Sequence, residues 1–396
     1  MTDSPHPHEA LNERASNHPL FREDAARRSS HARELSELWD MRRGSRLGGE
    51  EQYAYPFLWN LMLDVGINNF PAQIDRHALD QLLAVFSSRS IIHERACAWF
   101  QNILPRIPES DWIATIRQFG NWLTHVDEAT AKPLIQDLLQ EVEARALRMT
   151  GWNSYPKELL AFIVEAARIP ATGTVYVPYT PSFGLSKFLP SNAQGFFQFR
   201  SEHEAGIFAI HEVISEGHSA FVVADPQFEK TPFDEQFSAV IAAPPLNDRL
   251  GRNEDPTEIR CIKHALSVIK PGGRAVVCVG PSFLMRSGRY AEYREHLTCS
   301  KLIEAVIQLP SRLLSGSSFS LSLLILDTSV NRSKETLFID ASDCVVTGGS
   351  ERVPKLDFEK LLTRFSDDQH PSCRRVDEEG IRAKDYDLTP ARYIAQ

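Results

Sequence analysis

The sequence predicts an α/β protein in which an all-helical N-terminal domain precedes a largely parallel β-sheet. Between residues 50 and 150, apolar side chains recur at helical spacing, as Trp112, Ile116 and Phe119 do. From Gly173 to Asp340, short β-rich runs alternate with helical runs. Because this alternation is typical of parallel sheets with helices on both faces, we expect such a sheet in the second part of the chain.

The same patterns divide the chain into four regions. Residues 1–47 are rich in Arg, Ser, His and Glu and poor in large apolar side chains, which favours a disordered or partly helical arm. Residues 48–150 are expected to form a helical domain, and residues 151–345 the α/β domain. Residues 346–396 read as a polar C-terminal extension with one helix near Leu356–Phe365.

The β-rich runs and the turns between them predict how the sheet is built. A helix over Thr257–Lys270 has one apolar face and is stopped by a Pro-Gly-Gly sequence. The last long runs are joined by a Ser/Gly loop over 315–318, which predicts an antiparallel pair at one edge of the sheet. The expected strands are Thr174–Tyr179, Phe196–Arg200, Ala220–Ala224, Ala239–Ala242, Arg274–Val279, Leu302–Leu309, Leu321–Leu326 and Leu337–Ile339.

The composition argues against a protein that its overall charge draws to nucleic acid. The 396 residues carry a net charge of -9, so contact with DNA would need a local patch or a partner. The first residues lack the apolar core of a signal peptide, and runs such as Leu323–Leu326 are too short to span a bilayer. We therefore expect a cytoplasmic protein that does not associate with membranes.

Several common catalytic and metal-binding motifs are absent from the sequence. His203-Glu204 and His211-Glu212 lack a second histidine four residues on, so there is no H-E-x-x-H zinc motif. Neither the G-x-S-x-G elbow of serine hydrolases nor a phosphate-binding P-loop is present. The six cysteines form no C-x-x-C pair and are expected to be reduced, buried thiols. No metal site is predicted.

Seven stretches in the second part of the chain carry the functional signal. The first is the turn Val175–Gly184 after the first strand, where ligands bind in open α/β sheets. The others are Ser154–Glu158, Ala224–Pro226, Val240–Leu246, Gly272–Leu284, Leu302–Pro310 and Asp385–Leu388, the last standing shortly before an Arg392-Tyr393 pair.

Together these stretches resemble the DNA adenine-N6 methylases that serve as modification subunits of type I restriction-modification systems. The resemblance covers about residues 150–396. It implies a Rossmann-like class I methyltransferase fold and S-adenosylmethionine as the family's cofactor. In the family the first turn reads V-Y-D-P-A-C-G-S-G-G. Its glycines let the backbone approach the cofactor, and its acidic residue helps to hold the cofactor's ammonium group.

The catalytic motif of the family is altered here. Where the family has V-L-A-N-P-P-F, this chain has V-I-A-A-P-P-L, and the last four residues of this motif are Ala243, Pro244, Pro245 and Leu246. The family's Asn accepts a hydrogen bond from the exocyclic amine of adenine, and the aromatic residue stacks on the flipped base. A methyl group accepts no hydrogen bond, and leucine gives only generic apolar contact. The resemblance therefore implies a degenerate catalytic motif.

The cofactor positions are altered as well. Val177 replaces the acidic residue of the first turn, and only Gly184 remains near its glycines. Phe199 stands where the family has a Glu for the ribose hydroxyls, and Glu202 could replace that Glu only if the strand runs longer. Asp225 aligns with the family's contact to the cofactor's adenine, although a turn or N-cap role fits it equally well. Binding of S-adenosylmethionine is expected to be weak or lost.

These observations favour a catalytically degenerate methylase-like protein that binds a partner protein in a restriction-modification or defence context. Binding of DNA as well is left open by the sequence. One alternative is an active S-adenosylmethionine-dependent DNA adenine methyltransferase with divergent motifs. A second is a methyltransferase fold acting on a substrate other than adenine. The stripe formed by Trp112, Phe119 and Trp122 would suit a partner surface, but a place in the core of the helical domain is favoured.

Overall fold

The structure is a computed structural model. It describes residues 30–43, 49, 51–66, 75–150, 155–224, 232–233, 235–246, 254–314, 320–330, 334–346 and 354–394, with only the backbone for 41–43 and 144–150. The chain divides into two compact units, which are treated separately below. One comprises Met1–Ser154 with Ser201–His218, and the other Tyr155–Arg200 with Ser219–Gln396.

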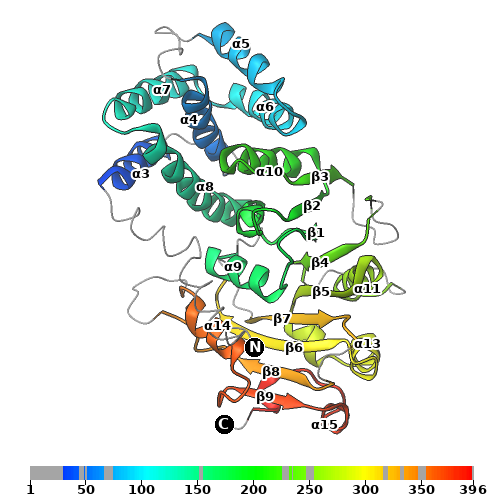
Figure 1. Ribbon diagram of the computed structural model, residues 1–396. Coiled ribbons are helices and arrows are strands. Elements are labelled where there is room, and N and C mark those ends of the chain that lie inside the picture. The colour runs from blue at the N-terminus through cyan, green and yellow to red at the C-terminus, as the bar shows by residue number, and fades with distance from the viewer. Residues whose placement is uncertain are drawn as a thin grey trace, which may run out of the picture. The chain divides into compact units, whose positions relative to one another are not determined.

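The first unit is all-helical, as predicted (Figure 1). Residues 30–43 of the predicted arm form a helix whose Leu35 and Trp39 are buried, while residues 1–29 lie outside the described residues. The helices of this unit are α3 (Ser30–Arg43), η1 (Glu51–Tyr53), α4 (Ala54–Val65), α5 (Arg76–Ser87), α6 (Ile91–Ile103), η3 (Leu104–Arg106), α7 (Glu109–Leu123), α8 (Glu128–Thr150) and α10 (Glu202–Ser215).

Aromatic packing holds the helical unit together. Trp112, Phe119 and Trp122 are all buried, and Phe119 stacks between the rings of Trp59 and Trp122 at 5.0 and 5.4 Å. The aromatic stripe is therefore core, as favoured. Helix α10 packs closely on α6, because a Cβ atom at Gly206 would lie 2.6 Å from a ring carbon of Trp99. Residues 202–215 thus belong to the helical unit, although in the sequence they come between two strands of the sheet in the second unit.

The second unit is built on a sheet in which nine strands are described. Their order is β3-β2-β1-β4-β5-β7-β6-β8-β9; the first five are parallel, β7 runs antiparallel to both of its neighbours, and β9 runs antiparallel to β8. The strands are β1 (Thr174–Tyr179), β2 (Gln194–Phe199), β3 (Ala220–Val223), β4 (Phe237–Ala242), β5 (Ile269–Val279), β6 (Ile303–Ser311), β7 (Ser320–Asp327), β8 (Thr336–Asp340) and β9 (Cys373–Val376).

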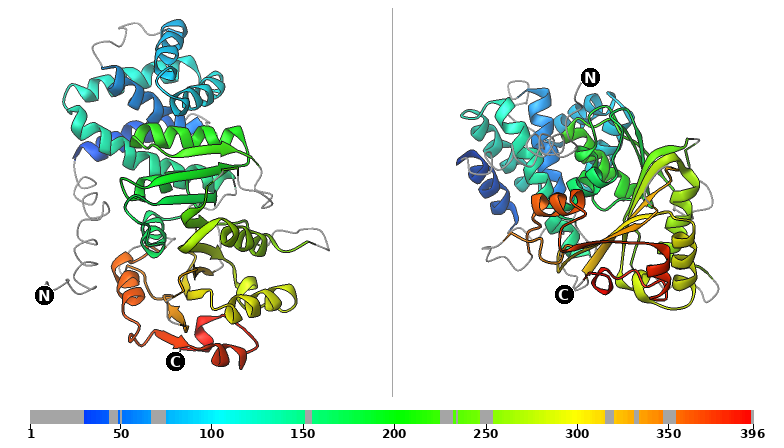
Figure 2. Two further views of the ribbon diagram at one scale, coloured as in Figure 1. Left: turned by 45° about the vertical axis from the view of Figure 1, so that its right-hand side comes forward. Right: turned by 60° about the horizontal axis from the view of Figure 1, so that its bottom comes forward.

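Helices cover both faces of this sheet. Helices α11 and α13 lie on one face, and α9 and α14 on the other (Figure 2). None of the helices in the described part of the chain is long and apolar enough to cross a membrane. The helices of this unit are α9 (Lys157–Ala166), η4 (Phe183–Phe188), α11 (Thr257–Val268), α12 (Pro281–Met285), α13 (Arg289–Cys299), α14 (Phe358–Ser366), α15 (Glu378–Arg382) and η5 (Pro390–Arg392).

Three expectations are corrected by the structure. The antiparallel pair β6–β7 lies inside the sheet and not at its edge, because β8 and β9 extend the sheet beyond it. Helix α11 ends at Val268 and not at Lys270, because Ile269 already pairs with Phe237 as the first residue of β5. The described C-terminal residues supply two α-helices, one 3-10 helix and a strand, not one helix alone. The loop 315–318 lies outside the described residues.

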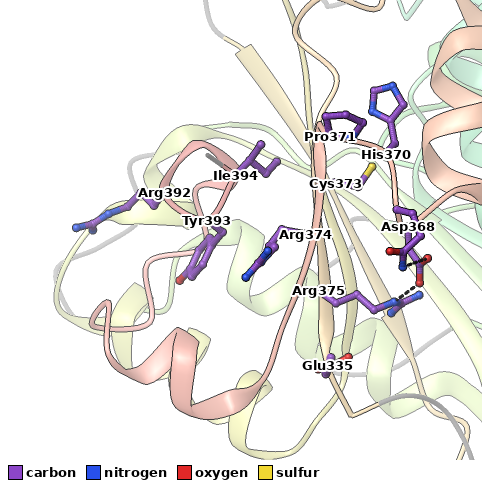
Figure 3. A pocket seen from close by; sticks show the side chains of 11 residues that line it. Glu335, Asp368, His370, Pro371, Cys373, Arg374, Arg375, Arg392, Tyr393 and Ile394 are labelled. Atoms are coloured by element: carbon purple, nitrogen blue, oxygen red, sulfur yellow. Dashed lines mark hydrogen bonds and ion pairs between the residues drawn. The ribbon is translucent and has the colours of Figure 1, made fainter. Parts of the chain in front are cut away.

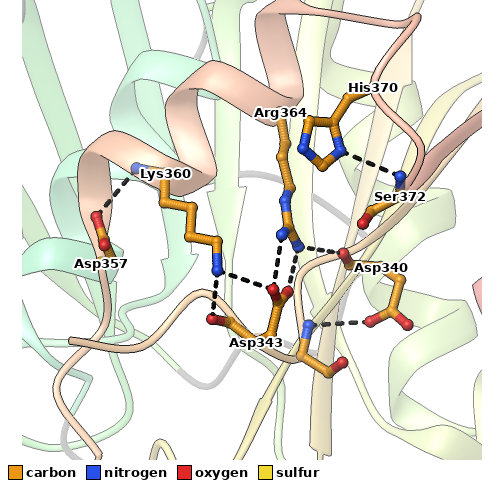
Figure 4. A network of polar contacts seen from close by, with 8 residues as sticks. Asp340, Asp343, Asp357, Lys360, Arg364, His370 and Ser372 are labelled. Carbon is orange, nitrogen blue, oxygen red and sulfur yellow. Dashed lines mark hydrogen bonds and ion pairs between the residues drawn. The ribbon is translucent and has the colours of Figure 1, made fainter. Parts of the chain in front are cut away.

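Buried polar contacts dock the C-terminal residues on the sheet. Arg364 of α14 is 3% exposed and donates to both carboxylate oxygens of Asp343 and to the carbonyl oxygen of Asp340, the latter at 2.7 Å (Figure 4). Lys360 donates to the same Asp343 carboxylate at 2.8 Å. Because Asp340 ends β8, this network fixes α14 at the end of that strand.

Candidate functional site

The carboxyl ends of β1 and β4 meet at the switch point of the sheet. The strand that follows β1 lies on one side of this point, and the strand that follows β4 lies on the other. Ligands of open α/β sheets bind at such a point. The backbone N–H of Ala243, directly after β4, donates to the carbonyl oxygen of Tyr179 at the end of β1, over 2.9 Å. The altered catalytic motif and the altered first turn therefore lie side by side, as predicted.

The turn after β1 is closed on itself. The Ser182 side chain caps η4 by accepting from the backbone N–H of Gly184 at 3.1 Å, and the Ser182 N–H donates to the Thr180 hydroxyl at 3.3 Å. Pro181 is buried and has no N–H to donate. Val177 is fully buried within β1. The turn thus carries no acidic side chain, and its Gly184 amide already has an internal acceptor.

Aromatic rings fill the space between this turn and the end of β2. Phe199 is the last residue of β2 and is 2% exposed. Its ring centroid lies 6.1 Å from that of Phe183 in η4 and 6.3 Å from that of Phe221 in β3. A carboxylate at position 199 would need water or a donor, whereas this environment is apolar. Position 199, where the resemblance to the methylases predicts a ribose-binding Glu, is therefore part of the core.

The two proposed acidic substitutes are placed differently. Strand β2 ends at Phe199, so the longer strand that a cofactor role for Glu202 requires is not formed. Ser201 instead caps α10, and Glu202 begins that helix in the helical unit, where its side chain is 65% exposed and forms an ion pair with Arg95. Asp225 lies outside the described residues.

A buried carboxylate beside the catalytic motif was not recognised from the sequence. Glu258 of α11 is 2% exposed, and burial raises the pKa of its carboxyl. It accepts from the Gly280 N–H at 2.9 Å and from the Tyr290 hydroxyl at 2.8 Å. A Cβ at Gly280 would lie 3.7 Å from the Leu246 side chain, which places Leu246 next to this group. No sequence pattern marks this residue, because a Glu in the first turn of a helix is common.

The chemistry open to the motif itself is narrow. Ala243 and Leu246 are half-buried and Pro244 is buried, and none of the four side chains from Ala243 to Leu246 can accept or donate a hydrogen bond. Only main-chain carbonyl oxygens remain as acceptors within this segment. Both carboxylate oxygens of Glu258 already have donors, so the geometry gives it the role of fixing the end of β5.

Comparison with known proteins identifies what the chain is similar to. The profile of the N-6 DNA Methylase family matches residues 204–396. The methylase subunit of the type I restriction enzyme MpnII from Mycoplasma pneumoniae is 30% identical over 140 residues. That match covers 35% of this chain and 26% of the relative, so the chain spans about a quarter of that protein's length.

Solved structures show the same fold over most of the chain. The methyltransferase subunit of a type I restriction-modification system from Streptococcus thermophilus superposes with a TM-score of 0.70 at 15% identity, covering 92% of this chain and 99% of that one. A chain from a structure of complex assembly in the type I restriction-modification system gives 0.66 at 16% identity, covering 91% and 90%. These likenesses confirm the predicted methyltransferase fold.

Proposed function

We propose that the chain, which matches the N-6 DNA methylase family over residues 204–396, is a catalytically degenerate methylase-like protein that acts by binding a partner protein, and DNA together with it, in a restriction-modification or defence context. One observation carries the proposal: the rings of Phe183 and Phe199 meet at the position where the resemblance to the methylases places the residue for the cofactor's ribose. Both side chains are apolar, so this contact between the turn after β1 and the end of β2 supplies no hydrogen-bond partner for a ribose.

The residues present do not fit S-adenosylmethionine. Its ammonium and ribose groups need an acceptor each, and the chain places Val177 and Phe199 at the two positions. A hydrogen bond to a charged group contributes about 1.5 to 3 kcal/mol, so losing two would weaken binding by roughly 100-fold or more. The closed turn adds to this, because Pro181 has no N–H to donate and the Gly184 N–H is already bonded to Ser182.

Calorimetry with S-adenosylmethionine tests this proposal. The wild-type chain is expected to show no saturable heat at micromolar ligand. The variant Phe199→Glu alone is also expected to show none, because Val177 and the closed turn remain. Micromolar affinity of the wild-type chain would contradict the proposal and favour an active enzyme.

Dependence on a partner is supported by the charge of the chain and by its relatives. The net charge of -9 provides no long-range attraction for DNA. A similar solved chain comes from a structure of complex assembly in the type I restriction-modification system. We infer that a second protein, equivalent in role to a specificity subunit, supplies DNA contacts for this chain.

A further inference from the structure

A polar pocket lies along β9, the last strand of the sheet order. Its volume is about 690 Å³, and β9 forms its floor between the segment that precedes the strand and the end of η5 (Figure 3). All of its lining residues come from the C-terminal part of the second unit. Those used below are Asp368, His370, Arg374, Arg375, Arg392 and Tyr393.

Arg374 is the cation of this pocket that has no partner among the described residues. Its side chain is exposed and points into the pocket beside Tyr393 (Figure 3). The two other arginines are engaged: Arg375 donates to Asp368 at 2.6 Å, and Arg392 donates to Asp387 at 2.7 Å. The carboxylates of Asp368 and Asp387 are therefore engaged by Arg375 and Arg392, and Arg374 keeps its donors for a ligand.

His370 lies away from Arg374. Its Nδ1 accepts from the backbone N–H of Ser372 at 3.1 Å, and its ring lies beside Arg364 (Figure 4). Arg374 points to the other side of β9, toward Tyr393 (Figure 3). The directed donor on the Tyr393 side of the pocket is therefore the guanidinium of Arg374.

The position of Arg374 is fixed by the sheet. Arg374 pairs with Phe338 of β8, so both side chains lie on the same face. Tyr393 stacks on Phe338 with ring centroids 4.0 Å apart, and its hydroxyl donates to the carbonyl oxygen of Asp387. The backbone of Arg374 is therefore fixed by strand pairing, and its side chain lies beside a packed aromatic ring (Figure 3). Both features reduce the entropy that the side chain loses on binding a ligand.

We infer that this pocket binds a phosphate group through Arg374, on the side of β9 where Tyr393 lies. The guanidinium fork matches two unprotonated phosphate oxygens bidentately, and these oxygens are acceptors. The phosphate can belong to a free anion or to the backbone of a nucleic acid strand. The inference uses no residue of the altered methyltransferase site and does not depend on the loss of cofactor binding.

A different role for the same arginine makes a different prediction. Charged residues on an edge strand prevent edge-to-edge association, and β9 ends the sheet among the described strands. If Arg374 only guards this edge, replacing it lowers solubility and leaves anion binding unchanged.

Binding measurements on the full chain separate these roles. Inorganic phosphate, a short single-stranded oligonucleotide and its duplex are titrated into wild type, Arg374→Ala, Arg374→Lys and Arg117→Ala. Arg117 of α7 is a matched control, because it is also exposed and lacks a partner among the described residues. Arg374→Ala is expected to weaken binding about ten- to a hundredfold, and Arg374→Lys less, because lysine keeps the charge but not the fork.

The pattern of results identifies the source of the phosphate. Loss of inorganic phosphate binding alone assigns the pocket to a free anion, and loss of oligonucleotide binding as well assigns it to a nucleic acid backbone. Equal binding by Arg374→Ala and wild type, or no binding of any probe to wild type, would overturn the inference. Binding of S-adenosylmethionine in parallel calorimetry would contradict the proposed function but leave this inference standing.

Discussion

At the scale of single residues, a buried arginine holds the C-terminal segment to the methyltransferase unit. Arg294 of α13 is 2% exposed and donates to three carbonyl oxygens: Phe283 and Arg286 at 2.9 Å each, and Tyr386 at 2.6 Å. Burial lowers the pKa of its guanidinium. The contact to Tyr386 joins residues 92 positions apart, so this one side chain anchors the segment around Tyr386. Leu388 in the same segment is fully buried in the core.

Replacing this residue should be strongly destabilising. Arg294→Met is expected to lower the free energy of unfolding by about 3 kcal/mol, because three buried carbonyl groups lose their donor. Urea denaturation of the full chain measures it. Arg289→Ala on the same helix is the control, since Arg289 is 44% exposed and its ion pair with Asp255 spans 3.6 Å. That variant should change stability by about 0.5 kcal/mol or less. Equal effects of the two variants would show that Arg294 is no anchor.

The candidate site was only partly predictable at this scale. The identities of Ala243, Leu246, Val177 and Phe199 could be read directly, because the motif order fixes which residue follows which strand. The ring contact between Phe183 and Phe199 could not, since it depends on how η4 folds against the end of β2, 16 residues further along the chain. Glu258 was missed for the same reason, because its partners Gly280 and Tyr290 lie far along the chain.

At the scale of elements, strands with apolar runs could be predicted from the sequence, whereas a polar strand at the edge of the sheet could not. All eight expected strands are present, because each contains a run of apolar residues; even β3, which is half-buried at the end of the strand order, reads Ala-Phe-Val-Val. Strand β9 was missed because Cys373–Val376 reads Cys-Arg-Arg-Val, and only its pairing with β8 makes it a strand. The prediction that β6 and β7 lie at the edge was wrong for the same reason, because it did not include β9.

The network that docks α14 should respond to acid. The Arg364 guanidinium holds the pKa of Asp343 well below its usual range. A carboxyl whose folded pKa is lowered stabilises the protein above its unfolded pKa of about 3.9, and this stabilisation is lost as pH falls through the folded pKa. Because the Asp343 side chain is 60% exposed, solvent screening limits the effect to about 1 kcal/mol.

Asp343→Asn should therefore be less stable than wild type at neutral pH, and the difference should shrink in acid. Urea midpoints at about pH 6 and about pH 3 measure it. Asp80→Asn is the control, because Asp80 forms an exposed ion pair with Arg76 one helical turn away. A difference between Asp343→Asn and wild type that does not change with pH would mean that the carboxylate charge has no part in docking α14.

At the scale of the whole molecule, an acidic chain with an altered site should depend on other proteins for DNA. Purified alone, it is expected to bind duplex DNA at physiological salt no more tightly than a non-specific protein does, with a dissociation constant of about 1 to 100 µM. Fluorescence anisotropy with and without the products of neighbouring genes measures this. A monomer that binds duplex DNA at nanomolar concentration without a partner would refute the proposed dependence.

Transfer of labelled methyl groups to adenine-rich DNA tests the central claim most directly. The exocyclic amine of adenine is a poor nucleophile, and the resemblance predicts that Ala243 replaces the Asn side chain that would accept one of its protons. Removing one preorganised partner of a developing charge costs about 100- to 1,000-fold in rate. Leu246 removes base stacking of about 1 to 3 kcal/mol. Ala243→Asn alone should therefore restore nothing, whereas its combination with Leu246→Phe and Val177→Asp is the variant in which a trace is expected.

The wild-type chain is predicted to give no incorporation above the background of DNA without protein, with or without the products of neighbouring genes. A type I methylase assayed in parallel on the same DNA shows that the conditions permit transfer. Clear incorporation of label into adenine by the wild-type chain would contradict the account and identify the protein as an active methyltransferase with a divergent site.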